Sequence, residues 1–354
     1  MSLDRLTPNQ RFAAYAAEQP LDRLPCVPII GNTAARVIGV KVSQLRQDAK
    51  LLAEAQIASY RKFGYDVVRV FTDLYVIGEA MGAKVKVPED ETAYLEAPAL
   101  ISLNELDKLR PARPQMNGIL ELQLEAMRRV AGEIGGEVPV TGALTCPFTN
   151  ASFLIGAEQL VRLTLKDPEV VHRLCRISLE SCLAYADAII DTGCTPSLTD
   201  AMSSSTVISP KQFREFSLPY LKTLIDHIGS RGRKVTLHIC GKTRPIWEDM
   251  VEAGAACLSI DNDADLQEAK IKVGDRVRLM GNVPPSAVML QGTPETVRRA
   301  VFKCAAQAAD SQKGLIIASG CSLPTETPFA NITAMMDAVR ELSWPVRKEL
   351  FENE

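Results

Sequence analysis

The sequence has few of the features that mark membrane-spanning, secreted or disulfide-bonded proteins. Its 354 residues contain no run of about 18 uncharged apolar residues, so we expect no segment that spans a bilayer. The N-terminal stretch MSLDRLTPNQRF has no apolar core of a secretory signal. Nine cysteines are scattered without a disulfide-like spacing, and their number is odd. We therefore expect reduced thiols and a cytoplasmic protein.

The chain also has no excess of charge of either sign. It carries 40 Lys and Arg against 43 Asp and Glu, a formal charge of −3, and these residues are interspersed along the chain. Proteins that bind nucleic acids or anionic membranes usually show a basic patch or stripe. The composition therefore argues against a nucleic-acid or membrane partner.

Eight short apolar runs rich in β-forming residues recur along the chain, and helical segments separate most of them. A strand that alternates with a helix eight times predicts a (β/α)₈ TIM barrel. Amphipathic stretches at 45–64 and 294–310 are typical of the outer helices, and the sequences KDPEVV, SPKQF and TPETV indicate helix starts. The eight predicted strands are 24–30, 65–71, 138–144, 195–201, 234–240, 256–262, 276–282 and 314–320.

An open doubly wound sheet is the alternative to a barrel, but it should begin with a glycine-rich turn. The early stretch IIGNTAARVIG does not match G-x-G-x-x-G, so a dinucleotide-binding fold is disfavoured. We find no internal repeat or long linker, and residues 1–354 are therefore expected to form one barrel domain with an N-terminal helical extension. The segment 72–137 is too long for one crossover and predicts an insertion of extra helices or a hairpin over the barrel.

Histidine is scarce, and one of the three histidines lies at the end of a predicted strand. His238 and Cys240 are two residues apart in the fifth predicted strand, so their side chains point to the same side. Cys321 ends the eighth predicted strand. In a barrel, all strands end at the C-terminal mouth, where barrel enzymes keep their catalytic groups. The three side chains are therefore expected to converge there, although ordinary core packing also explains a lone His-x-Cys.

One imidazole and two thiolates with an open fourth position form a typical catalytic zinc site. Because the two thiolates neutralise the charge of the ion, the site is a weak Lewis acid for water. A thiol bound to zinc is still deprotonated and keeps enough charge on sulfur to attack a methyl group. This ligand set favours alkyl transfer over hydrolysis.

Three stretches around these residues resemble a known family. They are HICGKTRPIWEDMVEAGAACLSIDN, RVRLMGNVPP and IIASGCSLPTETPFANITAMMDAVRE. They look like the methylcobalamin:coenzyme M methyltransferases, which belong to the uroporphyrinogen-decarboxylase-like barrels. The resemblance extends upstream over nearly the whole chain. It implies zinc on His238, Cys240 and Cys321, and a methyl group that moves to or from the cobalt of a methylcobalamin-type corrinoid. The chain has no D-x-H-x-x-G stretch, so the corrinoid is expected on a partner protein.

The resemblance leaves the reaction partners open. In one version the zinc position activates a thiol such as coenzyme M, or the pocket holds tetrahydrofolate. In the donor-side version a methyl ether, methanol or a methylamine is demethylated onto cob(I)alamin. A metal-free decarboxylase is a further alternative, but the stretch RLPCVPIIGNTAARVIG has only Arg23 and Arg36 where true uroporphyrinogen decarboxylases carry an arginine-rich segment. A corrinoid or pterin binder without catalysis is the third class.

Several other polar residues follow predicted strands and form a weaker set of substrate-binding candidates. An aspartate there can supply a fourth zinc ligand, orient the histidine or hold a substrate, although helix capping explains it equally simply. Two further cysteines end other strands and are the alternative ligands, whereas we expect no role for the remaining two histidines. The substrate-binding candidates are Asp73, Asp200, Asp261 and Asn282, the alternative ligands are Cys146 and Cys194, and the other histidines are His172 and His227.

Overall fold

The computed structural model describes residues 4–116 and 118–346. Its centre is a parallel eight-stranded sheet in the order β1-β10-β9-β8-β7-β6-β5-β2. Each strand coincides with one of the eight predicted runs, and only β5 and β9 end one residue beyond theirs, so the short apolar runs were a reliable signal. The strands are β1 (Cys26–Val27), β2 (Val68–Val70), β5 (Val140–Thr145), β6 (Thr195–Thr199), β7 (Thr236–Ile239), β8 (Cys257–Ile260), β9 (Arg278–Val283) and β10 (Leu315–Ser319).

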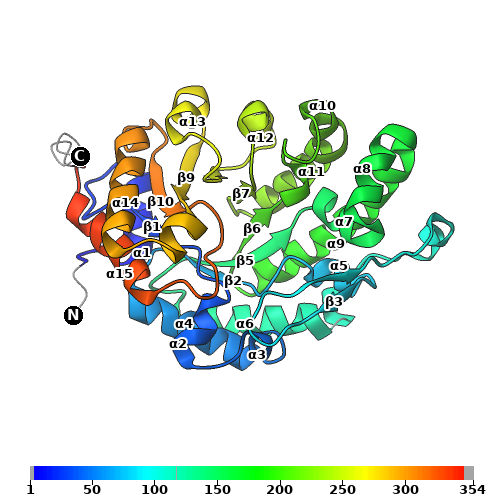
Figure 1. Cartoon of the computed structure of the whole chain (residues 1–354), viewed down its shortest axis with the longest axis horizontal. Helices are drawn as coiled ribbons and strands as arrows, with labels where there is room; N and C mark the ends of the chain where they lie inside the picture. Colours follow the sequence, from blue (N-terminus) through cyan, green and yellow to red (C-terminus); the bar gives the residue numbers. More distant parts are fainter. Residues whose placement is uncertain (1–3, 117, 347–354) are drawn as a thin grey trace.

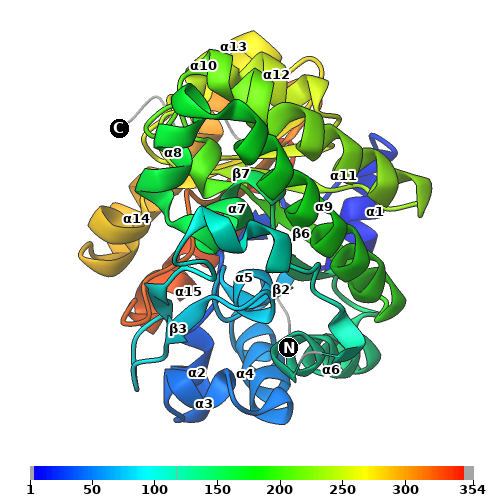
Figure 2. The ribbon, with the colours of Figure 1, turned by 90° about the vertical axis from the view of Figure 1, so that its right-hand side faces the viewer.

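The strand order is that of a barrel, because β1 and β2 are neighbours in sequence but lie at opposite ends of the ladder. The Asp66 backbone N–H, just before β2, donates to the Cys26 carbonyl in β1 at 2.9 Å and links the two ends. Figure 1 shows the helices arranged around the strands, with α2, α4 and α6 on one side and α12 and α13 on the opposite side. The same enclosure is visible after a quarter turn in Figure 2. The prediction of a (β/α)₈ barrel is confirmed.

At least one helix follows every strand of the barrel. Among the described residues, no helix is both long and apolar enough to cross a membrane. The α-helices are α1 (Pro8–Ala16), α2 (Thr33–Ile38), α3 (Val42–Leu45), α4 (Ala49–Phe63), α5 (Val76–Ala80), α6 (Gly118–Ile134), α7 (Pro147–Ile155), α8 (Ala157–Lys166), α9 (Pro168–Asp191), α10 (Pro210–Gln212), α11 (Leu218–Ser230), α12 (Trp247–Glu252), α13 (Leu266–Val273), α14 (Pro294–Ala308) and α15 (Phe329–Leu342). The 3₁₀ and π segments are η1 (Leu103–Lys108), η2 (Pro114–Met116), η3 (Ala201–Ser203), η4 (Phe213–Ser217), η5 (Arg244–Ile246) and η6 (Pro285–Leu290).

The predicted helix starts are confirmed where proline follows a capping residue. Helix α9 begins at Pro168, and the side chain of Asp167 accepts a hydrogen bond from the Val170 backbone. Helix α14 begins at Pro294, and Thr293 forms a capping box with Thr296. Proline fits the first turn because its missing N–H would have no partner there, and the capping side chain satisfies one of the free N–H groups.

The segment between β2 and β5 contains more than a single crossover helix. It holds α5, an antiparallel hairpin of β3 (Lys84–Lys86) and β4 (Tyr94–Ala97), the turns η1 and η2, and then α6. The hairpin lies outside the eight-stranded sheet. The organisation as one domain with an insertion at 72–137 stays a prediction.

Two separate apolar clusters form the core. The larger one lies between the strands and the surrounding helices and includes Val68, Val70 and Leu237. The smaller one lies inside the barrel, where many inward side chains are small or polar. Large branched side chains usually fill a barrel interior, so small ones leave space within it. The cluster inside the barrel consists of Val27, Ile29, Phe71, Ala143, Cys257, Met280, Ile316 and Ala318.

A buried ion network holds the N-terminal helix against the barrel. The carboxylate of Asp66, which is fully buried, pairs with both Arg11 and Arg23. It also accepts the backbone N–H of Cys26 at 2.6 Å. One carboxylate therefore connects α1, β1 and the start of β2, where the ends of the barrel meet.

Candidate metal centre

Strand β7 places His238 and Cys240 on the inner side of the barrel mouth. His238 is 5% exposed and Cys240 is half-buried at the end of the strand. Gly241 follows at φ +68°, and a β-carbon there would lie 2.8 Å from the Thr206 hydroxyl. Only glycine fits both this backbone conformation and this space. The chain can therefore turn away directly after Cys240.

Cys321 reaches the same mouth from the end of β10. It follows Gly320, where a β-carbon would lie 2.7 Å from the backbone nitrogen of Asn262. The close approach of these two backbones brings the loop after β10 over the end of the barrel. Glycine before Cys321 is thus needed for packing rather than for a special dihedral angle.

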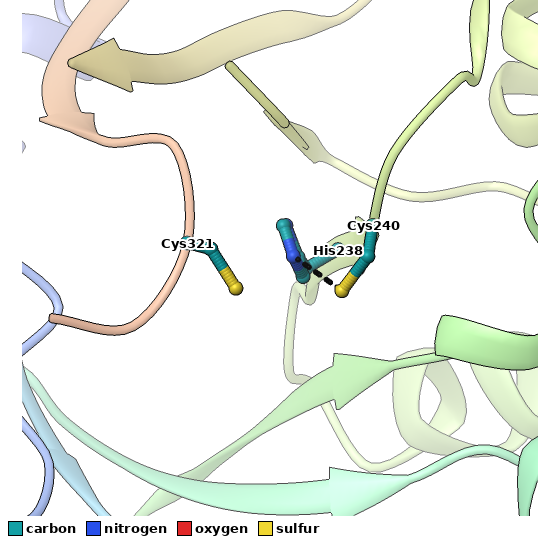
Figure 3. Close-up of side chains that lie close together, drawn as sticks. All are labelled: His238, Cys240 and Cys321. Atoms are coloured by element: carbon teal, nitrogen blue, oxygen red, sulfur yellow. Dashed lines mark hydrogen bonds between the residues drawn. The ribbon is translucent and has the colours of Figure 1, made fainter. Parts of the chain in front are cut away.

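The three predicted ligand atoms converge. One ring nitrogen of His238 and the Sγ atoms of Cys240 and Cys321 all lie within 4.8 Å of one another. Figure 3 shows the imidazole between the two thiols, with the Cys240 Sγ 3.2 Å from His238 Nε2. In the part of the chain that the structure describes, this is the one group of three His, Cys, Asp or Glu residues close enough to hold a metal ion.

Ser259 on β8 fixes the orientation of the imidazole. His238 Nδ1 lies 3.2 Å from the Ser259 carbonyl and 3.1 Å from its hydroxyl. Because a carbonyl can only accept, Nδ1 carries the proton and Nε2 keeps its lone pair for a metal. This arrangement, a ligand histidine that donates its second N–H to a nearby oxygen, is common at metal sites.

Replacing Ser259 with alanine is expected to weaken metal binding by about tenfold or less. Loss of a group that orients a ligand typically costs 10–100-fold in affinity, and here the backbone carbonyl stays in place to accept from Nδ1. Titration of the metal-free protein with zinc against a chromophoric competitor would measure the change. An unchanged affinity would show that the carbonyl alone sets the tautomer.

The two thiols do not titrate independently. A hydrogen bond from the Cys240 thiol, together with His238, lowers the pKa of Cys321. The same contact with Cys321, reinforced by burial, raises the pKa of Cys240. The charge state of each thiol therefore depends on that of the other.

The donor set fits a zinc ion. Zinc bonds of about 2.3 Å to sulfur and 2.0–2.1 Å to nitrogen require ligand atoms about 3.5–3.8 Å apart in a tetrahedral site. The spacing of these three atoms spans that range. Sulfur and imidazole nitrogen are also the ligand types that zinc prefers. The three side chains line a cavity of about 210 Å³, from which a further ligand could reach a bound ion. Its other lining residues include Ile29, Arg69, Thr72, Asp73, Tyr75, Thr199, Ser322 and Leu323.

Asp73 lines this cavity, but both of its carboxylate oxygens have partners. Arg46 and the Thr72 hydroxyl donate to Oδ2, and the Tyr75 backbone donates to Oδ1. Arg46 also pairs with Glu79. The role of Asp73 as a substrate-binding residue stays a prediction, and its hydrogen bonds argue against a role as fourth ligand.

Asp200 directly follows β6 and Asp261 directly follows β8, the two strands on either side of β7, and neither is among the residues that line the mouth cavity. Asp200 is fully buried and accepts from the Thr149 and Ser203 hydroxyls, among others. Burial raises the pKa of Asp200, and these hydrogen bonds oppose the shift. Asp261 accepts the Asp263 backbone N–H, which is a turn contact. Substrate-binding roles for both stay predictions.

The amide of Asn282 is directed at backbone groups of its own neighbourhood. Its Nδ2 donates to the carbonyls of Asp261 and Ala264 at 3.0 and 2.8 Å. Cys146 directly follows β5 as expected, whereas Cys194 directly precedes β6 and so lies at the opposite end of its strand, which corrects the prediction. Both are fully buried, and neither belongs to the metal-ligand group. The expected contact of Asn282 with a substrate also stays a prediction.

The two remaining histidines have local partners outside the cluster. His172 contacts the Tyr220 hydroxyl at 2.9 Å, and His227 contacts Asp187 at 3.0 Å. Sequence reasoning missed two residues at the centre, Ser259 and Arg69. A serine in a strand gives no signal, but a cation between two valines in VVRVF is an inward charge that could have been noticed.

The fold and the site define a class of protein: a (β/α)₈ barrel with a His-Cys-Cys group at its C-terminal mouth. Comparison with known families agrees with this class. The chain belongs to the uroporphyrinogen decarboxylase (URO-D) family, whose model matches residues 7–342.

Curated relatives of the chain carry two different names. A methylcobamide:CoM methyltransferase, MtaA, from Methanosarcina barkeri is 28% identical over 95% of this chain and 98% of its own length. A uroporphyrinogen decarboxylase from Aliivibrio fischeri is 26% identical over 96% of this chain and 99% of its own length. A methyltransferase structure from Methanosarcina mazei superimposes with a TM-score of 0.82 at 24% identity, covering 95% of this chain and 99% of that one, which shows the shared fold. The expected resemblance is confirmed, and the relatives support the prediction that the chain is a methyltransferase enzyme.

Proposed function

We propose that this protein is a zinc-dependent methyltransferase that moves a methyl group between a corrinoid on a partner protein and a small molecule bound at the barrel mouth. The observation that carries the proposal is the convergence of the His238 imidazole with the sulfur atoms of Cys240 and Cys321 beside a cavity of about 210 Å³. Two relatives named methylcobamide:CoM methyltransferases, MtaA and MtbA, support the reaction type.

The residues of the centre would hold zinc through one nitrogen and two sulfur atoms. A bound zinc ion supplies a Lewis acid that keeps a coordinated thiol deprotonated at neutral pH. The Nδ1–H of His238 donates to Ser259, which leaves Nε2 to bind the ion.

We favour the version in which the small molecule accepts the methyl group. The substrate thiol loses its proton to solvent, its sulfur attacks the methyl carbon, the cobalt–carbon bond breaks, and the bonding electron pair stays with cobalt. The mouth cavity of about 210 Å³ suits a small thiol better than tetrahydrofolate. The corrinoid would enter with its carrier protein, since the sequence has no motif to hold it.

A decarboxylase is the less favoured function, although decarboxylases are among the relatives. A polycarboxylate ring substrate would need a large cavity. The two cavities described inside this barrel are only about 210 and 260 Å³, which suits a smaller molecule. A metal-free decarboxylation would also give no role to the converging side chains of His238, Cys240 and Cys321.

Elemental analysis combined with a methyl-transfer assay tests the proposal. Protein purified without added metal is expected to contain about one zinc per chain, which chelation removes. The zinc protein should then demethylate methylcobalamin with 2-mercaptoethanesulfonate, followed by the visible spectrum of the corrinoid. Methylation of cob(I)alamin by methanol or a methylamine instead would reverse the direction. Absence of zinc, even after zinc is added, would overturn the proposal.

A further inference from the structure

A second cavity inside the barrel, the inner cavity, opens at the end opposite the metal centre. It has a volume of about 260 Å³. Its outer lining residues lie at or just before the starts of strands, and among them Lys234 and Ala256 are exposed and Arg278 is half-buried. Because neighbouring strands of the barrel are parallel, their starts share the end away from Cys240 and Cys321. The inner cavity can therefore be entered from the N-terminal end of the barrel without passing the mouth.

The interior of this cavity is mostly apolar. Val27, Met280 and Ile316 line it, and they belong to the small apolar cluster inside the barrel. Small side chains such as Ser197 and Cys257 stand where bulky ones usually fill a barrel. An engineered apolar cavity of about 150 Å³ in another protein takes up benzene. By that measure the inner cavity has room for about ten carbon-sized atoms.

Arg69 borders both cavities, but it directs its guanidinium at the mouth. Nη2 donates to the Thr199 hydroxyl at 2.7 Å, and the guanidinium lies over the Phe71 ring at 4.8 Å. Thr199 and Phe71 line the mouth cavity and are not among the residues that line the inner cavity. The inner cavity therefore faces the stem of Arg69 rather than its charged end.

Positive side chains stand at the opening of the inner cavity. Lys234 and Arg278 both line it. The contacts of Arg278 are with neutral groups, since its Nε donates to the Lys313 carbonyl at 3.1 Å and its guanidinium lies over the Tyr15 ring at 4.7 Å. Among the described residues, no Asp or Glu lines the inner cavity. An acidic group at the opening would therefore meet cations without a competing carboxylate in the cavity.

The positive charge continues into a neighbouring cavity of about 480 Å³. This cavity shares Pro139 and Thr195 with the inner cavity, so the two adjoin at the same end of the barrel. It adds Arg233 and also Arg128, which is paired with Glu121, and its lining in the described part of the chain contains no Asp or Glu. A cleft lined by one sign of charge concentrates ligands of the opposite sign. The N-terminal end of the barrel therefore favours a ligand with an apolar body and an acidic head.

We propose that the N-terminal end of the barrel is a second binding site, for a medium-chain carboxylic acid. The apolar chain would lie in the inner cavity, and the carboxylate would contact Lys234 and Arg278 at its opening. The far end of the chain would approach Ser259, which lines the cavity beneath the metal centre. The proposal does not rest on the proposed methyl transfer, because neither cation belongs to the metal centre.

Calorimetry with three simple amphiphiles tests the site in the protein as purified. Octanoate is expected to bind about 15-fold more tightly than hexanoate, since each buried CH₂ group contributes about fourfold in affinity. The neutral analogue 1-octanol should bind about two- to fivefold more weakly than octanoate, because it cannot pair with the cations. Absence of octanoate binding, or equal affinities for octanoate and hexanoate, would overturn the proposal.

Variants at the opening locate the carboxylate. Lys234→Gln and Arg278→Gln are each expected to weaken octanoate binding by about two- to fivefold, the range for partly exposed ion pairs. Neither should change the affinity for 1-octanol. Lys313→Gln is the matched control, because Lys313 lies two residues before β10 as Lys234 lies two residues before β7, but it does not line the inner cavity. An equal loss in all three variants would show a general effect of charge and overturn the site.

Two further variants decide between the two ends of the barrel. Cys257→Phe places a ring in the inner cavity and should abolish octanoate binding, with the melting temperature as the check that the protein is folded. Cys321→Ala alters only the mouth and should leave octanoate binding unchanged. Loss of binding in Cys321→Ala would place octanoate at the mouth and overturn the proposal. If Cys257→Phe does not fold, the variants at Lys234 and Arg278 still decide the question.

Discussion

Replacing Cys321 with alanine is expected to abolish both zinc binding and methyl transfer while the barrel stays folded. The loss of a group that only orients a ligand costs 10–100-fold in affinity, so the loss of a direct ligand should cost more than about 100-fold. The fold should persist because Cys321 is only half-buried and its side chain faces a cavity. Zinc content, methylcobalamin demethylation and the circular dichroism spectrum measure the three parts of this result.

The neighbouring residue offers a matched control for this variant. Ser322 lines the same cavity, but its side chain does not belong to the metal-ligand group. Ser322→Ala should therefore retain about one zinc per chain and most of the activity. Stoichiometric zinc in Cys321→Ala would show that the ligand assignment is wrong. Loss of zinc in both variants would point instead to a general disturbance of the loop after β10.

Replacing Asp66 with alanine is expected to destabilise the protein by about 3–5 kcal/mol, the range for removing one partner of a buried ion pair. The substitution leaves Arg11 and Arg23 buried with one carboxylate fewer. It also removes the acceptor for the Cys26 backbone N–H next to the closure of the barrel. Urea unfolding followed by fluorescence would give the change in the free energy of unfolding.

An exposed ion pair provides the comparison for this effect. Arg61 and Glu137 pair at the surface, where a salt bridge is worth about 0–1 kcal/mol. Glu137→Gln should therefore change the free energy of unfolding by no more than about 1 kcal/mol. Similar effects of Asp66→Ala and Glu137→Gln would mean that the network around Asp66 does not stabilise the closure.

The alternation of apolar runs and helices was sufficient to predict the barrel. Buried parallel strands read as continuous apolar runs, and proline after a capping residue marks helix starts, so both signals are local. The path of the chain between β2 and β5 could not be predicted in the same way. Its hairpin lies outside the main sheet, and neither of its strands is a long apolar run.

The candidate site was predictable where position in the barrel decides the geometry. His238, Cys240 and Cys321 end strands, and all strands of a barrel end at one mouth. The partners of these residues were not predictable, because they depend on the strand register. Ser259 supports His238 only because β8 lies beside β7, and Arg69 reaches Thr199 across the intervening strand β5.

In this barrel, most of the residues that stabilise the fold lie on the outer face of the strands, whereas the residues that line the internal cavities lie on the inner face. The apolar packing that holds the fold together lies mainly between the strands and the helices, so small inward side chains such as Ala143 and Ala318 contribute little to it. Evolution can therefore exchange inward residues without a large loss of folding energy. A family built in this way can keep one scaffold while its members diverge in chemistry, as relatives that carry the names of a methyltransferase and a decarboxylase at nearly equal identity illustrate.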